Sequence, residues 1–159
     1  MRSNGLVRGS YHFYRVAMDP EQQVQLYLRM LGGAPERGDI APVLDFEADS
    51  FPTAARPPKE KVQADLLRAL QMLERQGGRV PMIYTNWDMG KNWLDDERFA
   101  RYPLWIADWS QRDSPRLPPT WARQGFRFWQ RTDSYQPPSP NKLAMDLDWF
   151  IGRREDLVR

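Results

Sequence analysis

The 159-residue chain contains no cysteine, and this absence removes several chemistries at once. Disulfides, thiolate metal sites and a cysteine nucleophile all require that residue. Histidine is almost absent too, because His12 is the single one. A histidine-cluster metal site is therefore not expected, and a Ser-His-Asp triad would need His12 as its base in a sequence that lacks a Gly-x-Ser-x-Gly motif. We expect His12 to be a packed strand residue, and we expect no metal or other cofactor.

The chain also lacks a glycine-rich phosphate loop and any apolar run near the ~20 residues of a membrane span. Residues 1–6 contain no long apolar stretch, so no signal peptide is visible. The formal net charge is only +2, and the basic residues, most of them Arg, are scattered among acidic ones. This pattern is typical of a solvated surface, so we expect no nucleic-acid partner.

Aromatic side chains, by contrast, are abundant, at 13% of the residues with seven Trp among them. A core needs few tryptophans, so several are expected to line a groove, where flat apolar faces suit sugar rings. The hydrophobic fraction of 41% and the length are those of one globular domain, which we place at residues 1–159.

Strand-like and helix-like segments alternate through the first half of the chain, which predicts an α/β fold with a parallel sheet. Amphipathic stripes predict one helix from Asp19-Pro20 to Gly32 and a second from Pro58 to Gly77-Gly78. Helical segments then shorten, with a short helix or irregular loop at 86–94 and a polar loop at 133–142. Strands are expected at 9–15, 41–47, 80–85, 103–109, 126–131 and 144–150.

The strand expected at 41–47 ends in two carboxylates, Asp45 and Glu47. Because side chains alternate along a strand, Val43, Asp45 and Glu47 should share one face. Two like charges so close together favour protonation of one of them, which suits general acid catalysis near neutral pH. A strand that runs into solvent and ends in acidic loop residues would show the same spacing, so spacing alone leaves both interpretations open.

Several other expected strands end in polar or aromatic residues, at the sheet edge where α/β proteins place their sites. This convergence favours carboxylate chemistry on a sugar, in which a protonated carboxyl serves the leaving oxygen and a second group stabilises the oxocarbenium-like centre. Glu47 is the expected proton donor and Asp45 the ionised partner. Asp146 is either a third acid or a strand-end cap. The other strand-end residues are Tyr84-Thr85, Asp108-Trp109 and Gln130.

Six segments stand in a characteristic order along the chain. They are Gly-Ser-Tyr-His-Phe (9–13), Pro-Val-Leu-Asp-Phe-Glu (42–47), Pro-Met-Ile-Tyr-Thr-Asn (81–86), Pro-Leu-Trp-Ile-Ala (103–107), Trp-Gln (129–130) and Met-Asp-Leu-Asp-Trp-Phe-Ile-Gly (145–152). Together they resemble glycoside hydrolase family 25, the Chalaropsis-type lysozymes. The resemblance implies a TIM-like β/α barrel and an N-acetylmuramidase that cleaves the β-1,4 bond between N-acetylmuramic acid and N-acetylglucosamine in bacterial cell walls. It also implies Glu47 as general acid, Asp45 as the group that orients the 2-acetamido substituent or acts as second carboxylate, and Asp146 as the matching late Asp.

The same resemblance implies an aromatic substrate wall around Tyr84, Trp105 and Trp109. Further substrate contacts are expected from neighbouring strand positions. These are Tyr11, Asp108, Trp129 and Gln130.

One departure from the family pattern concerns its first two strands, whose Asp-x-Ser and Lys-Ala-x-Glu-Gly type motifs have no counterpart in this sequence. We therefore expect an incomplete barrel of about six strands out of eight, with open edges at the strands of residues 9–15 and 144–150. Rearranged local segments, a two-fold partner chain in a homodimer, or direct pairing of these strands would cover the edges. The alternative function is a weakly active or inactive relative that only binds cell-wall glycan.

Overall fold

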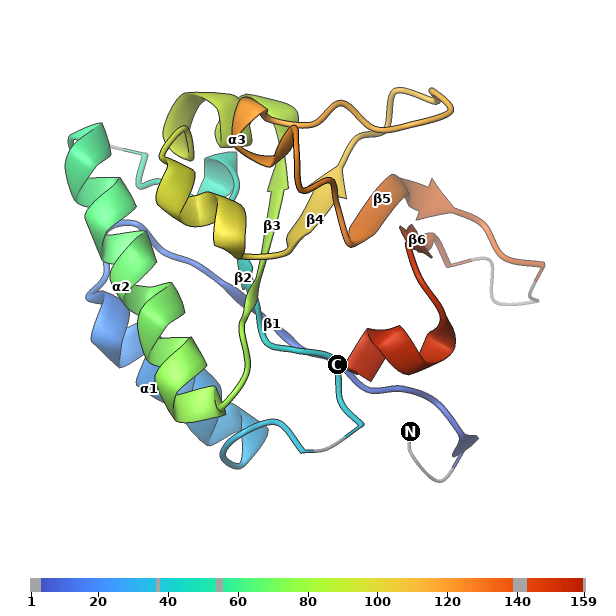
Figure 1. Cartoon of the computed structure of the whole chain (residues 1–159), viewed down its shortest axis with the longest axis horizontal. Coiled ribbons are helices and arrows are strands. Elements are labelled where there is room, and N and C mark those ends of the chain that lie inside the picture. Colours follow the sequence, from blue (N-terminus) through green and yellow to red (C-terminus); the bar gives the residue numbers. More distant parts are fainter. Residues whose placement is uncertain (1–3, 37, 54–55, 139–142, 159) are drawn as a thin grey trace.

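The computed structural model of the chain describes residues 4–36, 38–53, 56–138 and 143–158. These residues form one six-stranded sheet in the order β1-β2-β3-β4-β5-β6, with helices packed beside it (Figure 1). The strands are β1 (Tyr11–Phe13), β2 (Val43–Asp45), β3 (Met82–Asn86), β4 (Leu104–Ala107), β5 (Phe128–Tyr135) and β6 (Met145–Phe150). The α-helices are α1 (Pro20–Leu31), α2 (Lys59–Gly77) and α3 (Trp87–Trp93), and the 3-10 helices are η2 (Ala48–Ser50), η3 (Glu97–Arg101), η4 (Pro119–Trp121) and η5 (Arg154–Val158).

The sheet is not wholly parallel, which corrects the expectation from the sequence. Strands β1 to β5 run parallel to their neighbours, whereas β6 pairs with β5 in the antiparallel sense. The reason is the short connection between Tyr135 and Met145, since a parallel pair needs a crossover of a dozen residues or more. The described residues therefore form a curled six-stranded half-barrel of mixed α/β class, with short helices toward the C-terminus.

The two faces of the sheet have different coverings, and side-chain alternation assigns each residue to one of them. On the outer face, Leu44, Ile83 and Ile106 are fully buried in the main core, beneath α1 and α2. On the inner face, Val43 and Met82 belong to a smaller apolar cluster against which η5 packs; Figure 1 shows η5 across the sheet from α1 and α2. The smaller apolar cluster and η5 thus cover only one end of the inner face.

Local signals set the helix ends close to where the sequence predicts them. The Asp19 carboxylate accepts a hydrogen bond from the Gln22 N–H at 2.9 Å, Pro20 opens α1, and Gly32 ends it with φ of 78°. Residues 87–93 form a helix rather than an irregular loop, because the Asn86 side chain accepts from the Met89 N–H at 3.0 Å.

The edge strands β1 and β6 do not pair with each other in the described part of the chain. The alternative in which these two strands close a smaller barrel is therefore wrong. The loop expected at 133–142 is partly strand, because β5 continues to Tyr135, and residues 139–142 lie outside the described residues. No helix in the described ranges combines the length and the hydropathy that crossing a bilayer requires.

Gly90 in α3 provides a test of the packing that holds α3 against η4. A Cβ atom at Gly90 would lie 2.3 Å from Pro118 Cγ and 2.7 Å from Pro118 Cβ. Alanine normally stabilises a helix interior relative to glycine, but here we expect Gly90→Ala to lower the free energy of unfolding by about 1–3 kcal/mol, because the ring cannot move without shifting η4. Urea unfolding measures the effect.

Gly77→Ala at the end of α2 is the matched control, because its added Cβ would meet Pro35 and Pro42 at ordinary distances of 3.6 and 3.8 Å. This variant should unfold at the wild-type urea concentration or slightly above it. Equal stability of the two variants would contradict the packing argument.

Candidate active site

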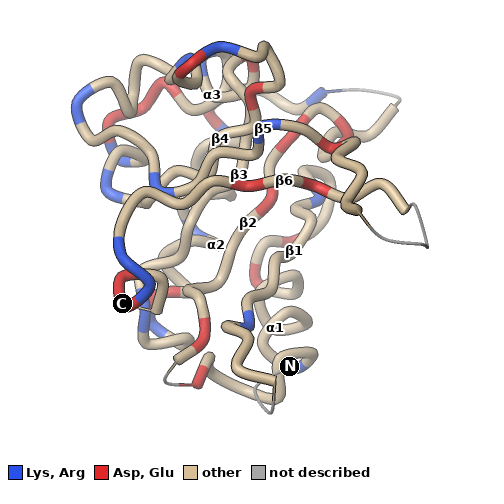
Figure 2. Tube along the Cα trace, turned by 90° about the vertical axis from the view of Figure 1, so that its right-hand side faces the viewer, with Lys and Arg blue, Asp and Glu red and all other residues tan. Residues whose placement is uncertain are grey.

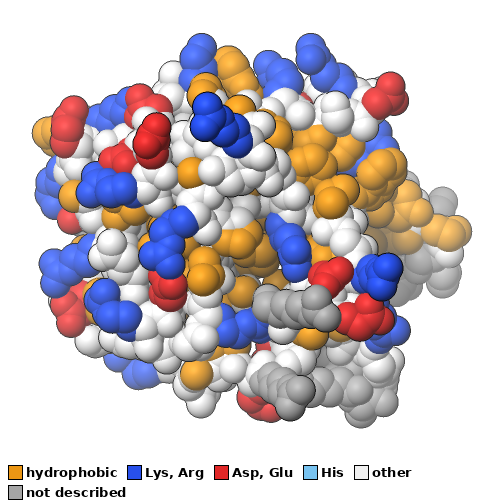
Figure 3. Space-filling view, viewed as in Figure 1, with side chains coloured by type: hydrophobic (Ala, Val, Ile, Leu, Met, Phe, Trp, Pro, Cys, Tyr) orange, Lys and Arg blue, Asp and Glu red, His pale blue; other side chains and the backbone are white. Residues whose placement is uncertain are grey.

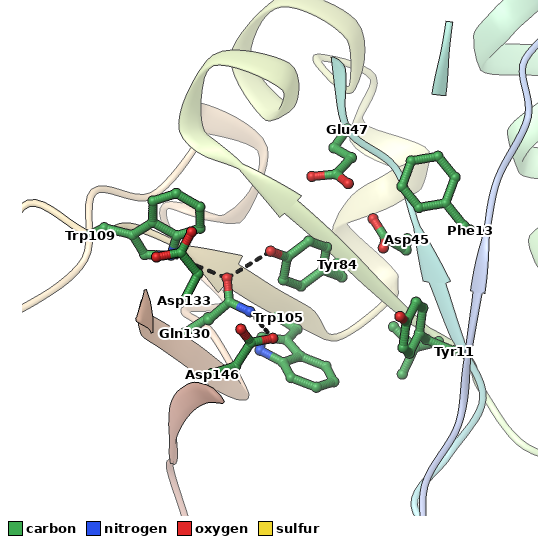
Figure 4. Close-up of a pocket in the computed structure, with 11 residues that line it drawn as sticks. Tyr11, Phe13, Asp45, Glu47, Tyr84, Trp105, Trp109, Gln130, Asp133 and Asp146 are labelled. Atoms are coloured by element: carbon green, nitrogen blue, oxygen red, sulfur yellow. Dashed lines mark hydrogen bonds between the residues drawn. The ribbon is translucent and has the colours of Figure 1, made fainter. Parts of the chain in front are cut away.

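A cavity of about 350 Å³ lies on the inner face of the sheet, toward the carboxyl ends of the parallel strands (Figure 4). Among the described residues, its lining combines acidic and aromatic side chains and includes no Lys, Arg or His. The residues are Tyr11, Phe13, Val43, Asp45, Glu47, Tyr84, Trp105, Trp109, Gln130, Asp133 and Asp146.

Strand β2 and the residues after it supply Val43, Asp45 and Glu47 to the cavity, as the alternation predicts. Leu44 and Phe46, between them, are fully buried in the core on the opposite face. Glu47 itself lies beyond the end of β2, where its N–H donates to Ser50 Oγ at 3.1 Å. The start of η2 therefore holds the Glu47 backbone while its carboxyl reaches into the cavity (Figure 4).

Burial dominates the electrostatics of this acid pair. Asp45 is only 7% exposed, and its Oδ1 atom has no hydrogen-bond partner among the described residues. Burial, and then the charge of Glu47, raise the pKa of Asp45 to about 7. Burial and the charge of Asp49 raise the pKa of Glu47 as well. The pair therefore retains a proton near neutral pH, and the larger rise falls on Asp45, the residue for which the sequence suggested the ionised role.

The third acid, Asp146, reaches the cavity from β6, on the far side from β2. Figure 2 shows acidic positions on both strands near the middle of the molecule. The Gln130 amide nitrogen donates to Asp146 Oδ2 at 2.8 Å, and the Gln130 amide oxygen accepts from Tyr84 Oη at 2.7 Å and Trp109 Nε1 at 3.1 Å. Neighbouring strands thus connect the two acidic sides of the cavity.

Aromatic rings form the floor and rims of the cavity. Tyr84 and Trp105 meet edge to face with ring centroids 5.6 Å apart. Tyr11 on β1 is 64% exposed and Trp109 is 51% exposed, so both offer ring faces to a ligand. All four rings had been expected at the site from the sequence.

Two of the expected substrate contacts, Trp129 and Asp108, do not line this cavity. Trp129 is buried in the main core and donates its indole N–H to the Asp108 carbonyl at 2.8 Å, because its position on β5 faces the helices. The Asp108 side chain lines a neighbouring pocket, where it accepts from the Arg116 N–H at 2.7 Å. Although burial raises the pKa of Asp108, these backbone and side-chain hydrogen bonds outweigh it and lower that pKa.

His12 is a packed residue. Its ring stacks on Tyr27 with centroids 5.5 Å apart, and its Nε2 lies 3.3 Å from the amide oxygen of Gln23. Burial lowers the pKa of His12. Among the described residues, no group of three or more His, Asp and Glu side chains could hold a metal ion.

Sequence reasoning missed Phe13 and Asp133 in the lining, and Asp148 behind it. Asp148 accepts from the Trp105 indole N–H at 2.7 Å, which holds this ring in the floor. Its spacing of two residues from Asp146 is a signal that the alternation rule could have used. For Asp133 the sequence carries no such signal, because the residue looked like part of a polar loop.

The buried carboxyl of Asp45, whose Oδ1 atom has no hydrogen-bond partner among the described residues, is expected to lower the stability of the folded protein. Its pKa of about 7 in the folded protein exceeds the ordinary value of 3.8, so between these pH values the folded state binds the extra proton and stability falls as pH rises. Asp45→Asn removes this cost. We expect the variant to gain roughly 2–4 kcal/mol in free energy of unfolding at pH 8 and nothing below pH 4.

Thermal or urea unfolding of both proteins across this pH range provides the measurement. Asp113→Asn, at an exposed position, is the control and should show no such pH-dependent gain. A loss of stability at pH 8 in Asp45→Asn would contradict the interpretation of Asp45 as a strained acid.

Comparison with known proteins agrees with the geometry. A family model described as glycosyl hydrolases family 25 matches residues 1–139. The uncharacterized protein YegX of Escherichia coli K12 is 30% identical over 156 residues, which are 98% of this chain and 52% of YegX. The chain thus spans about half the length of this curated relative.

Solved structures show the same fold. A muramidase from Acremonium alcalophilum superposes with a TM-score of 0.81 at 27% identity, over 99% of this chain and 75% of that one. A bacterial lysozyme from Streptomyces coelicolor superposes with a TM-score of 0.84 at 21% identity, over 99% and 73% of the two chains. With its acid pair, its curled sheet and the family match over most of its length, the chain belongs to glycosyl hydrolase family 25.

Proposed function

We propose that residues 1–159 form a single catalytic domain that hydrolyses peptidoglycan as a muramidase. The bond would be the β-1,4 linkage between N-acetylmuramic acid and N-acetylglucosamine. The observation that carries this proposal is the proton-retaining pair of Asp45 and Glu47 in a cavity with an aromatic floor. Membership of family 25 and the similarity to a muramidase from Acremonium alcalophilum support it.

In this mechanism Glu47 protonates the oxygen of the leaving sugar. Glu47 is half-buried and lines both the main cavity and the neighbouring pocket, so its carboxyl can reach a glycosidic oxygen that lies between them. A bound glycan would displace water from Glu47 and raise its pKa further, which favours the protonated form required of a general acid.

Asp45 is more deeply buried than Glu47 and acts on the reacting sugar from the floor of the cavity. It either orients the 2-acetamido group or serves directly as the second carboxylate, and both roles require its negative charge as positive charge develops at the anomeric carbon. The form of the pair that carries its proton on Glu47 leaves Asp45 ionised at that moment. Asp146, across the cavity, adds a further negative charge beside the same centre.

The glycan strand would lie along the aromatic rims. The exposed rings of Tyr11 and Trp109 border opposite sides of the cavity and can stack on sugar faces, while Tyr84 and Trp105 form the floor between them (Figure 4). On the face of the molecule shown in Figure 3, basic and acidic side chains are interspersed. We propose the bacterial cell wall as the place of action.

Glu47→Gln tests the assignment of the general acid. The amide keeps the size of the side chain but has no proton to give, so we expect clearing of a cell-wall suspension to fall by about 10²–10⁴-fold. Binding to insoluble peptidoglycan should persist, because the cavity walls remain. Glu97→Gln, at an exposed position of η3, should keep wild-type activity. Equal turnover of Glu47→Gln and wild type would end the proposal.

The second candidate function is glycan binding without efficient hydrolysis. It is favoured by the open side of the cavity, where Tyr11 is 64% exposed on a strand that has no described neighbour beyond it. Small misplacements of substrate cost large factors in rate. Retention of the wild-type protein on peptidoglycan without release of reducing ends would support this function.

We also propose that a two-fold partner covers the open edge of β1 in a homodimer. Within the described residues the outer edge of β1 has no neighbouring strand, and the exposed side chain of Leu6 lies nearby in the chain, which supports this. Light scattering should give the mass of two chains. A compact monomer at micromolar concentration would contradict it.

A further inference from the structure

Gln130 occupies a position between the two acidic sides of the cavity. It lies on β5, where its backbone is in register with Ala107 of β4 and Asp148 of β6. The side chain is only 5% exposed although it lines the cavity. A residue that mainly bound substrate would present more of its amide to the open space.

The hydrogen bonds determine which way the amide of Gln130 points. The indole Nε1 of Trp109 can only donate, so the atom 3.1 Å from it must be the amide oxygen. The same oxygen lies 2.7 Å from Tyr84 Oη, which must therefore donate as well. The amide nitrogen then faces Asp146 Oδ2, 2.8 Å away, and donates to it. Figure 4 shows this chain of three contacts.

Each neighbour is restricted by this arrangement. The Tyr84 hydroxyl keeps its proton, because burial and the charges of Asp45 and Glu47 raise its pKa. The Oδ2 atom of Asp146 accepts from the Gln130 amide, which fixes the orientation of this carboxyl group. Tyr84 lies on β3, Trp109 follows the end of β4 and Asp146 lies on β6, and the Gln130 amide is the group that contacts all three.

We propose that Gln130 is a positioning residue of the hydrolase, one that sets the orientation of Asp146 and the placement of Tyr84 and Trp109 around the acid pair. Glutamine suits this role because one end of its side chain accepts two hydrogen bonds while the other donates. Neither glutamate nor an apolar residue offers that combination at neutral pH. The kinetic part of this inference rests on the proposed muramidase function.

Gln130→Glu provides the discriminating test. The introduced carboxylate can still accept from Tyr84 and Trp109, but it faces Asp146 with a like charge and has no proton to donate. At pH 7 we expect kcat to fall about 10–100-fold with little change in KM. As pH is lowered, the carboxyl pair takes up one proton, the hydrogen bond to Asp146 reforms, and the ratio of variant to wild-type kcat should rise.

Gln130→Leu is the matched control, because it removes both ends of the amide. Its kcat should fall at every pH, with no recovery in acid. If Gln130 were merely a packing residue, the two variants would differ from wild type by a constant factor across the pH range. Wild-type kcat and pH profile in Gln130→Leu would likewise overturn the proposal.

A second readout needs no activity. The ¹⁵N indole resonance of Trp109, assigned by its loss in Trp109→Phe, reports on the group at position 130. In Gln130→Glu it should titrate with a midpoint above the ordinary glutamate pKa, since two facing carboxyls share a proton. Adding Asp146→Asn should return the midpoint to the ordinary range or below, because the asparagine amide donates.

The two readouts separate the possible failures. The expected titration in a protein that hydrolyses no glycan would uphold the role of Gln130 and reject the muramidase proposal. An indole resonance that does not respond to pH in Gln130→Glu would overturn the positioning role, whatever the enzyme's activity.

Discussion

The site depends on one constraint, the burial of Asp45 beside Glu47 on the inner face of a curled sheet. Removing a carboxylate from water is costly, and an adjacent charge increases that cost. The free energy that offsets it comes from the outer face, where Leu44 and Phe46, the residues on either side of Asp45, are completely buried. The segment of residues 44–46 thus contains both the carboxyl whose burial is unfavourable and the apolar side chains whose burial offsets that cost.

This division between faces extends across the sheet. Strands β2 to β5 each direct one set of side chains into the main core beneath α1 and α2 and the other set to the inner face. Because η5 and the smaller apolar cluster fill the inner face at the other end of the strands, polar groups collect at the carboxyl ends of the strands. The position of the site is therefore a consequence of which half of the inner face is filled.

Gln130 shows how the antiparallel strand contributes to the chemistry. Pairing of β6 with β5 places Asp146 and Asp148 on the inner face, next to Gln130 and Trp105. A parallel strand at this edge would reverse the direction of the backbone and give different neighbours to both carboxylates. The departure from a wholly parallel sheet is thus part of how the third acid reaches the cavity.

The sequence by itself determined the local elements and the acid pair. Capping by Asp19, termination by Gly32 and the alternation of Val43, Asp45 and Glu47 depend on neighbouring residues, so they could be predicted without tertiary contacts. The family resemblance followed from ordered motifs and is confirmed. The roles of the individual acids and rings stay predictions.

Only the tertiary structure decided the direction of β6 and the position of Trp129 in the core. It also decided that burial raises the pKa of Asp45, the acid for which the sequence suggested the ionised role, to about 7. These depend on how deeply a side chain is buried and on which strand lies beside it. Residue spacing does not give the depth of burial or the neighbouring strand, because both depend on contacts between separate segments of the folded chain.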